Sequence, residues 1–335
     1  MSPVERVLQT AGGFVPARCL LTVADLAIAD LLEAEPVSVT ALASACKVDV
    51  GALHRVLRLL AAHGIFAVNG EMVSHTPESL LLQSAHPQSL RSMVRMIGAP
   101  VNARPVEHLH HAVETGASSA EQAYPEGYWG YLAQHPEESR LFDAAMQAKA
   151  HAQIAAILDA YDFSSFRRIA DIGGGRGHLL RAVLDRYPRS QGVLFDQPHV
   201  IADASSLASD RLEFHSGDFF EDRLPEADAY VLMEVIHDWT DPDASRVLQS
   251  VRRATPGHGR LLLIESLIPD QPTANWTQMM DIFMLALFGG KQRTEREYVD
   301  LAAPAGFEWQ RTVSAGPVDI LEFAASNHQA GGFGR

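Results

Sequence analysis

Residues 169–180, IADIGGGRGHLL, run from a short apolar strand through a cluster of glycines into an amphipathic helix. Glycine lets the backbone turn tightly and approach a ligand closely, and the first turn of a helix offers unpaired N–H groups. In parallel sheets this arrangement lies at the carboxyl edge, where ligands bind. The segment therefore predicts an α/β domain that binds a nucleotide-like ligand.

Strand and helix patterns alternate after this segment, which predicts a parallel sheet with helices on both faces. One of these helices is expected at Pro242–Ala254. Two strand-like runs, 307–313 and 318–324, predict a terminal antiparallel hairpin, and residues 326–335 are expected to form a loose tail. The expected parallel strands are Arg168–Ile172, Gly192–Phe195, Leu212–His215, Ala229–Ile236 and Arg260–Glu265.

The first hundred residues show a different pattern, and a chain of 335 residues has room for two domains. One amphipathic helix is expected over Phe14–Leu32, followed by two shorter helices, the second over Val50–His63. The dipeptide Asn69-Gly70 then stands in an alternating run and is favoured in two-residue hairpin turns. These elements predict a winged helix in 1–100, and we assign a helical connector and the sheet to 101–335.

The charge of the chain argues against nucleic acid as a partner. Lys and Arg number 27 against 41 Asp and Glu, and the resulting net charge of −14 would repel a polyanion. Residues 1–100 hold seven basic and eight acidic residues, too few positive charges for a surface that contacts phosphates. We therefore expect the winged helix to pack against a second copy of the chain, which would make a homodimer.

Membrane and metal partners are not expected either. No apolar stretch approaches the ~20 residues of a membrane span, and the N-terminus lacks the pattern of a secretion signal, so we expect a cytoplasmic protein. The segment EHLHH at 107–111 suggests a metal site, but it is not an isolated i, i+4 His pair with an acidic third ligand. A partly solvated helix face is the favoured interpretation.

Acidic residues stand at the ends of the next two predicted strands. Asp196 comes 23 residues after Gly173, where a carboxylate can accept hydrogen bonds from ribose hydroxyls. Asp218 follows the third strand and could accept from an adenine amino group, with Phe219 covering the ring face. His178 stands where a dinucleotide fingerprint has its third glycine, which weakens an NAD interpretation without removing it.

His237 and Glu265 follow the fourth and fifth predicted strands, at the same edge of the sheet. If these strands are neighbours, the carboxylate can accept from one imidazole nitrogen and leave the other to take a proton from a substrate. A phenol with a pKa of about 10 is mostly protonated at neutral pH, so removing its proton makes it a better nucleophile. We expect His237 to act as this general base.

The ordered motifs DIGGGRG, LFDQPHVI, GDFF, VIHDW, LLLIES and GGKQRT resemble those of the S-adenosylmethionine-dependent O-methyltransferases of the plant caffeic-acid type and their bacterial natural-product relatives. The resemblance covers nearly the whole chain. It implies an α/β protein with a Rossmann-like class I methyltransferase sheet and a mostly helical N-terminal winged-helix dimerisation domain. It also implies S-adenosyl-L-methionine as the cofactor and a hydroxyl of a small aromatic, secondary-metabolite-like molecule as the methyl acceptor.

The resemblance assigns roles to individual residues as well. His237 would be the general base, flanked by Glu265. The expected cofactor-binding residues are Asp171, Gly173, Gly175, Asp196, Asp218 and Phe219. The acceptor pocket should be apolar and aromatic, and the expected acceptor-binding residues are Phe142, Met146, Asp238, Met280 and Met284; of these, only Met146 and Met284 match positions that clamp the acceptor in family members.

Two positions depart from the family pattern. Gln292 stands where the family motif GGKERT has a Glu, and a Gln can hydrogen-bond but cannot stabilise an imidazolium by charge. Glu234 stands three residues before His237, where a basic residue is often found. Four alternatives remain open: an N-methyltransferase, a family member that has lost methyl transfer, an NAD-dependent reductase and a winged-helix regulator.

Overall fold

The computed structural model describes residues 1–204 and 209–326, so most of the tail expected at 326–335 lies outside the described residues. The chain forms two compact units. We call Met1–Arg104 with Trp129–Lys149 the N-terminal unit, and Pro105–Tyr128 with Ala150–Arg335 the sheet unit. The helical segment that follows residue 100 is therefore divided between the two units.

The N-terminal unit begins with the helix, turn, helix and hairpin predicted from the sequence. Ser38 and Asp49 cap the two short helices, because each side chain accepts a hydrogen bond from a backbone N–H three residues on. Gly70, at a φ of 60°, forms the hairpin turn. The elements are α1 (Pro3–Ala11), α2 (Phe14–Asp25), η1 (Ile28–Leu31), β1 (Val37–Ser38), α3 (Val39–Cys46), α4 (Val50–Ala62), β2 (Phe66–Asn69) and β3 (Met72–His75), with strand order β1-β3-β2.

The single helix expected over Phe14–Leu32 is wrong, because α2 ends at Asp25. Ala27 adopts a φ of 53°, and the chain continues as the short 3-10 helix η1. The Arg91 Nε donates to the Ala24 carbonyl oxygen at 2.7 Å and occupies an acceptor that a continuing helix would use. The bend turns Ile28 into the apolar core of the unit.

Helices make up the chain between the hairpin and the sheet, as expected. Among the described residues no single helix is long and apolar enough to cross a membrane, and α1 and α2 pass that test only as a pair bent by 45°. These helices are α5 (Pro77–Leu80), α6 (Arg91–Gly98), α7 (Pro100–Glu107), α8 (Leu109–Thr115), α9 (Ala120–Ala123), α10 (Gly127–Gln134) and α11 (Pro136–Ala160).

A seven-stranded sheet forms the centre of the sheet unit, in the order β6-β5-β4-β7-β8-β10-β9. The first five strands in this order are parallel, and β10 pairs antiparallel with both β8 and β9, which confirms the terminal hairpin. The strands are β4 (Arg168–Ile172), β5 (Gln191–Asp196), β6 (Leu212–Ser216), β7 (Ala229–Met233), β8 (Arg260–Glu265), β9 (Phe307–Ala315) and β10 (Val318–Ala325).

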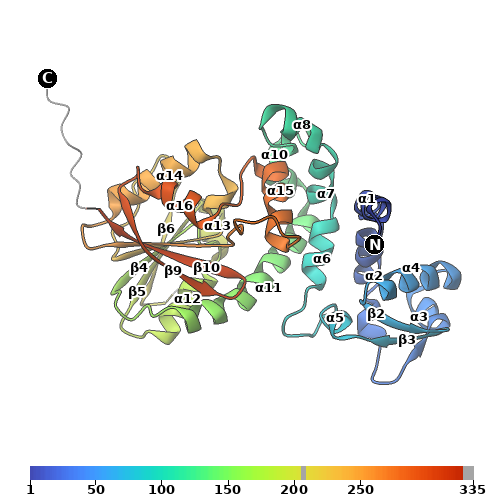
Figure 1. Ribbon diagram of the computed structural model, residues 1–335. Coiled ribbons are helices and arrows are strands. Elements are labelled where there is room, and N and C mark those ends of the chain that lie inside the picture. Colours follow the sequence, from blue (N-terminus) through green and yellow to red (C-terminus); the bar gives the residue numbers. More distant parts are fainter. Residues whose placement is uncertain (205–208, 327–335) are drawn as a thin grey trace. The chain divides into compact units, whose positions relative to one another are not determined.

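Helices cover both faces of this sheet (Figure 1). Buried residues of α14 and α16 form one core with the sheet, and those of α12 and the end of α11 form a second core on the opposite face. Because both faces are covered, the central strands are almost continuously apolar. The helices that follow the first strand are α12 (His178–Arg186), α13 (Pro198–Ala204), α14 (Asp241–Ala254), α15 (Trp276–Phe288) and α16 (Glu295–Ala302).

The strand expected over Ala229–Ile236 ends earlier than predicted, at Met233. Glu234 adopts a φ of 53° and turns the chain out of the sheet. The Ile236 N–H then donates to the Glu265 carboxylate at 2.9 Å instead of a neighbouring strand. His237 consequently lies in a short 3-10 helix, η3 (Ile236–Asp238), beyond the end of β7.

Candidate active site

The predicted site residues of the sheet unit gather at the carboxyl ends of the parallel strands. The chain proceeds from β4 outward through β5 to β6 and then returns to place β7 on the other side of β4. At such a reversal the segments that follow the two strands diverge, which leaves a crevice outside their carboxyl ends. Open α/β sheets bind ligands there. Gly173 directly follows β4 and Glu234 directly follows β7, so both residues border the crevice.

The glycine turn after β4 packs closely against the side chain of Asp171. Gly173, Gly175 and Gly177 all have positive φ, which glycine adopts without a Cβ penalty. A Cβ on Gly174 would overlap the Asp171 carboxyl group, whereas a Cβ on Gly175 would meet nothing within 4 Å. The turn therefore rests on Asp171 and presents an open backbone surface at Gly175.

Asp171 lies beneath this turn instead of at its surface. The side chain is 2% exposed, and its Oδ1 has no hydrogen-bond partner among the described residues. Burial and the neighbouring Asp196 carboxylate raise the pKa of Asp171 to about 7. This position fits a supporting role under the glycine turn better than direct contact with a ligand.

Asp196 ends β5 beside the glycine turn. Its Oδ2 accepts from the Gly175 N–H at 2.8 Å, and its Oδ1 accepts from the Gln197 N–H at 2.7 Å. Burial raises the pKa of Asp196 above its usual value, against these backbone hydrogen bonds. Each carboxylate oxygen has a second lone pair, so Asp196 can still accept from a ligand hydroxyl.

Asp218 and Phe219 follow β6 at the same edge. Asp218 is exposed, and its Oδ1 accepts from the Phe220 N–H at 2.8 Å. The Phe219 ring packs edge-on against Trp239, with 5.8 Å between ring centroids. Trp239 was absent from the predicted site, although its place in the VIHDW motif beside His237 could have indicated it.

His237 is buried between three side chains. Its Nδ1 lies 3.0 Å from the Glu265 Oε2 and 3.1 Å from the Gln292 Nε2, and its Nε2 lies 3.3 Å from the Asp238 Oδ1. The Glu265 side chain is fully buried, and β7 and β8 are neighbours, which was the condition for the two residues to meet. The structure thus brings the predicted imidazole and carboxylate together.

The charges around His237 decide its protonation. Burial alone would lower the pKa of His237, but the Glu265 and Asp238 carboxylates outweigh burial and raise that pKa to about 9. Gln292 contributes no charge, and its Oε1 has no hydrogen-bond partner among the described residues. At neutral pH the unliganded site therefore favours the imidazolium form.

The GGKQRT loop holds the turn that carries His237. The Arg293 side chain is fully buried and donates to the carbonyl oxygens of Ile236 at 3.0 Å and Trp239 at 2.9 Å. It also donates to the Asp241 Oδ1 at 2.7 Å, and a Cβ on Gly290 would overlap the His237 carbonyl oxygen. Neither residue was predicted from the sequence, although both stand in the GGKQRT motif.

The predicted acceptor residues fall into two groups. Met280 is half-buried and Met284 buried on α15, a helix that contacts η3, which carries His237 and Asp238. Phe142 and Met146 lie on the part of α11 that belongs to the N-terminal unit, where Phe142 packs edge-on against Trp129 at 5.5 Å. Asp238 adjoins His237 on η3, and α15, which carries Met280 and Met284, contacts η3 within the sheet unit.

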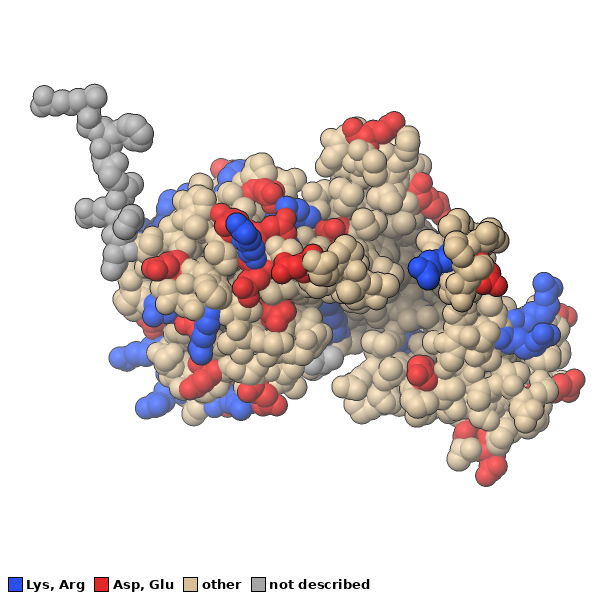
Figure 2. All heavy atoms as spheres, viewed as in Figure 1, with Lys and Arg blue, Asp and Glu red and all other residues tan. Residues whose placement is uncertain are grey.

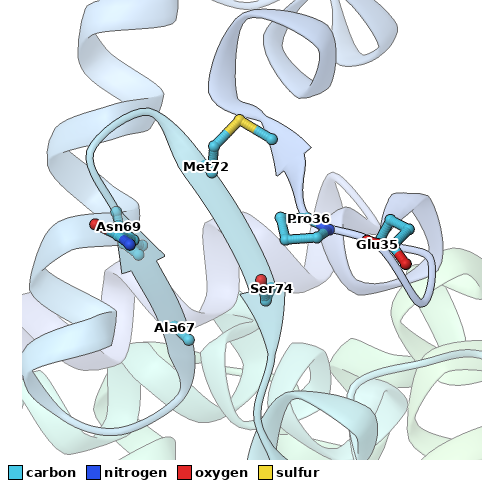
Figure 3. Close-up of a pocket in the computed structure, with 7 residues that line it drawn as sticks. Glu35, Pro36, Ala67, Asn69, Met72 and Ser74 are labelled. Carbon is cyan, nitrogen blue, oxygen red and sulfur yellow. The ribbon is translucent and has the colours of Figure 1, made fainter.

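Metal binding and one surface hollow remain to be described. Within the described part of the chain, no group of three or more His, Cys, Asp or Glu side chains is placed to hold a metal ion. A surface hollow of about 530 Å³ lies on the β2–β3 hairpin of the N-terminal unit (Figure 3). Glu35 is the only ionisable side chain among its lining residues, which are Glu35, Pro36, Ala67, Val68, Asn69, Met72 and Ser74.

Comparison with known proteins identifies two family matches. An O-methyltransferase domain matches residues 106–308, and an O-methyltransferase dimerisation domain matches residues 8–84. The phenazine O-methyltransferase PhzM of Lysobacter antibioticus is 37% identical over 94% of each chain. The 8-amino-8-demethylriboflavin N,N-dimethyltransferase of Streptomyces davaonensis is also 37% identical, over 91% of this chain and 90% of the other.

A solved structure adds information on ligands. The O-methyltransferase NcsB1 from neocarzinostatin biosynthesis was solved in complex with S-adenosylmethionine and 2-hydroxy-5-methyl naphthoic acid. It is 29% identical, with a TM-score of 0.78 over 93% of this chain and 96% of that chain.

Proposed function

Since the chain belongs to the O-methyltransferase family, we propose that it methylates a hydroxyl of a small aromatic, secondary-metabolite-like acceptor with His237 as general base. The enzyme is an S-adenosylmethionine-dependent O-methyltransferase of secondary metabolism. The observation that carries the finer proposal is the buried contact of 3.0 Å between His237 and Glu265 at the ligand-binding edge. An aromatic acceptor is supported by the naphthoic acid bound to NcsB1.

The residues at the sheet edge fit the cofactor. Gly175 offers an open backbone surface, Asp196 offers carboxylate oxygens for ribose hydroxyls, and Phe219 offers an aromatic face for adenine. When bound, S-adenosylmethionine supplies a methyl group on a positively charged sulfur. The chain's own residues then have to orient the acceptor and remove its proton.

His237 can perform this proton removal in its neutral form. In the proposed mechanism Nδ1 carries a proton that faces the Glu265 Oε2 at 3.0 Å, which leaves Nε2 as the nitrogen that takes the acceptor proton. Asp238, 3.3 Å from Nε2, would stabilise the imidazolium that results. A positive charge brought into the crevice lowers the pKa of His237 by repulsion, so cofactor binding favours the neutral base.

We predict that Gln292→Glu shifts the acidic limb of the pH–rate profile to higher pH. A carboxylate near Nδ1 in place of the amide favours the imidazolium, so the pKa of His237 rises further above about 9 and less neutral base remains at any given pH. The profile of kcat/KM against pH measures the shift. The matched control is Gln310→Glu on the exposed strand β9, which should leave the profile unchanged.

We also propose that the N-terminal unit forms a homodimer. The matched dimerisation domain covers residues 8–84, and the exposed apolar side chains of α1 and α2 need a partner surface; they are Val4, Val7, Leu8, Phe14 and Val15. A stable interface of this kind commonly buries more than ~2,000 Å². Light scattering should give twice the 36.5 kDa subunit mass, and Phe14→Glu should lower it. A wild-type mass of one subunit at micromolar concentration would refute the dimer.

Nitrogen methylation is the second candidate. The riboflavin-analogue N,N-dimethyltransferase has the same 37% identity to this chain as the phenazine O-methyltransferase. Paired aromatic acceptors that differ only in a hydroxyl or an amino group, supplied with methyl-labelled cofactor, distinguish the two. Transfer to the phenol supports the proposal, and transfer to the amine alone contradicts it.

A further inference from the structure

Tyr298 carries a buried phenol that the mechanism above does not use. The side chain belongs to α16 and is fully buried in the core that this helix shares with the sheet. Its hydroxyl has no hydrogen-bond partner among the described residues. A buried hydroxyl without a partner is costly, because it has lost its bonds to water and gained none. The position therefore calls for a nearby group to which the hydroxyl can donate.

The Glu265 carboxylate is the group that needs such a donor. Its Oε1 accepts from the Ile236 N–H at 2.9 Å. Its Oε2 faces the His237 Nδ1 at 3.0 Å, yet it accepts no well-aligned hydrogen bond from the described residues. Two carboxylate oxygens offer about four acceptor sites, and a fully buried carboxylate is stable only when donors fill them. Glu265 therefore has room for an O–H donor in addition to the imidazole.

The charges that act on the Tyr298 hydroxyl are those of Glu265 and Arg293. Burial and the Glu265 carboxylate raise the pKa of Tyr298 well above its usual value, and the Arg293 guanidinium acts in the opposite direction. The Arg293 guanidinium carbon lies 5.7 Å from the centre of the Tyr298 ring. The same guanidinium donates to the carbonyl oxygen of Ile236, whose N–H donates to Glu265. The phenol therefore stays protonated, as a donor must.

We propose that Tyr298 is a positioning residue for the base, and that its hydroxyl donates to the Glu265 Oε2 and fixes the carboxylate that faces His237. Oε2 has two lone pairs, so it can accept from the phenol and from the imidazole together. The phenol offsets part of the carboxylate charge and keeps the imidazolium from being favoured too strongly. This inference rests on the proposed role of His237 and adds the group that acts on its carboxylate partner.

Tyr298→Phe should raise the pKa of His237. The carboxylates that act on His237 are Glu265, Asp238 and Glu234, and all three favour the imidazolium. Without the hydroxyl, the Glu265 charge is less offset and favours the imidazolium more strongly. The acidic limb of the profile of kcat/KM against pH should therefore move to higher pH by about 0.5–1 unit, the size expected for the loss of one hydrogen bond.

Stability distinguishes a bonded hydroxyl from one without a partner. Loss of a hydrogen bond to a charged group should raise the unfolding equilibrium constant of Tyr298→Phe about 10-fold or more, whereas loss of an unbonded buried hydroxyl leaves stability unchanged or increases it. Tyr230→Phe is the matched control. Tyr230 is also fully buried, but its hydroxyl bonds only backbone groups, so this change should lower stability and leave the pH profile in place.

NMR titration of the His237 ring, in enzyme without cofactor or acceptor, tests the inference independently of catalysis. A rise in the pKa of His237 in Tyr298→Phe that disappears in the Glu265→Gln background supports it. An unchanged or lower pKa, the same rise in the Glu265→Gln background, or undiminished stability of Tyr298→Phe would each overturn it. A rise seen by NMR without a matching shift of the rate profile contradicts the base assignment instead and leaves the contact between Tyr298 and Glu265 standing.

Discussion

His237→Ala should lower the methyl-transfer rate about 10²- to 10⁴-fold and leave the affinity for S-adenosylhomocysteine nearly unchanged. The imidazole is proposed to act on the acceptor proton in the transition state, so its removal affects kcat far more than cofactor binding. Single-turnover rates and calorimetry on the same preparation separate the two effects. His258→Ala is the matched control, because His258 is exposed and pairs with Asp228 away from the crevice.

Glu265→Gln should slow the same step by a smaller factor. The amide still accepts a hydrogen bond but no longer stabilises the imidazolium by charge, so the pKa of His237 falls and the acidic limb moves to lower pH. Full activity of His237→Ala would show that orientation of the acceptor suffices or that the acceptor arrives ionised. In that case the base assignment fails while the cofactor assignment stands.

The sheet was the part of the fold most accessible to sequence analysis. The predicted bounds of β4 (Arg168–Ile172) and β8 (Arg260–Glu265) agree with the structure to the residue. A strand covered on both faces is a mostly apolar run, and its ends are visible in the sequence: glycines follow β4, and polar residues stand at both ends of β8. The pairing of His237 with Glu265 was predicted only on the condition that the two strands are neighbours, because neighbouring parallel strands end at one edge.

The ends of α2 and β7 could not be predicted in this way, because they depend on side chains that are distant in the sequence. The end of α2 involves Arg91, which bonds the Ala24 carbonyl from 67 positions along the chain. The early end of β7 involves Glu265, which takes the Ile236 N–H that a longer strand would have paired. Hydrophobic periodicity carries no information on these contacts, and it therefore predicted a longer helix and a longer strand.

The charged residues counted in the composition lie mixed on the protein surface. On the face shown in Figure 2, acidic and basic side chains are interspersed. Charged residues on the surface of a protein that binds a small molecule need only be solvated, so their pattern contains little information about the site. The charges that matter for the proposed chemistry are the few buried ones, Glu265, Arg293 and His237 among them.

Arg293→Met should destabilise the sheet unit by about 1–3 kcal/mol, because the loss of the guanidinium removes the donor to the Trp239 carbonyl oxygen and one of the two donors to the Ile236 carbonyl oxygen. The ion pair with Asp241 adds little, since the Asp241 side chain is 55% exposed and screened by water. Denaturant unfolding measures the loss. The matched control is Arg253→Met on the exposed face of α14, which should change stability by less than about 0.5 kcal/mol.

The same arginine should also position the base, and Arg293→Lys tests this separately from folding. A lysine keeps the positive charge but lacks the planar guanidinium that donates to both carbonyl groups. The turn 236–239 therefore loses one of the contacts that hold it in place. We expect kcat to fall by about 10-fold or more at a temperature where the variant is fully folded, with the affinity for S-adenosylhomocysteine unchanged. Wild-type kcat in a destabilised Arg293→Lys variant would limit Arg293 to a structural role, because the turn would then hold His237 without it.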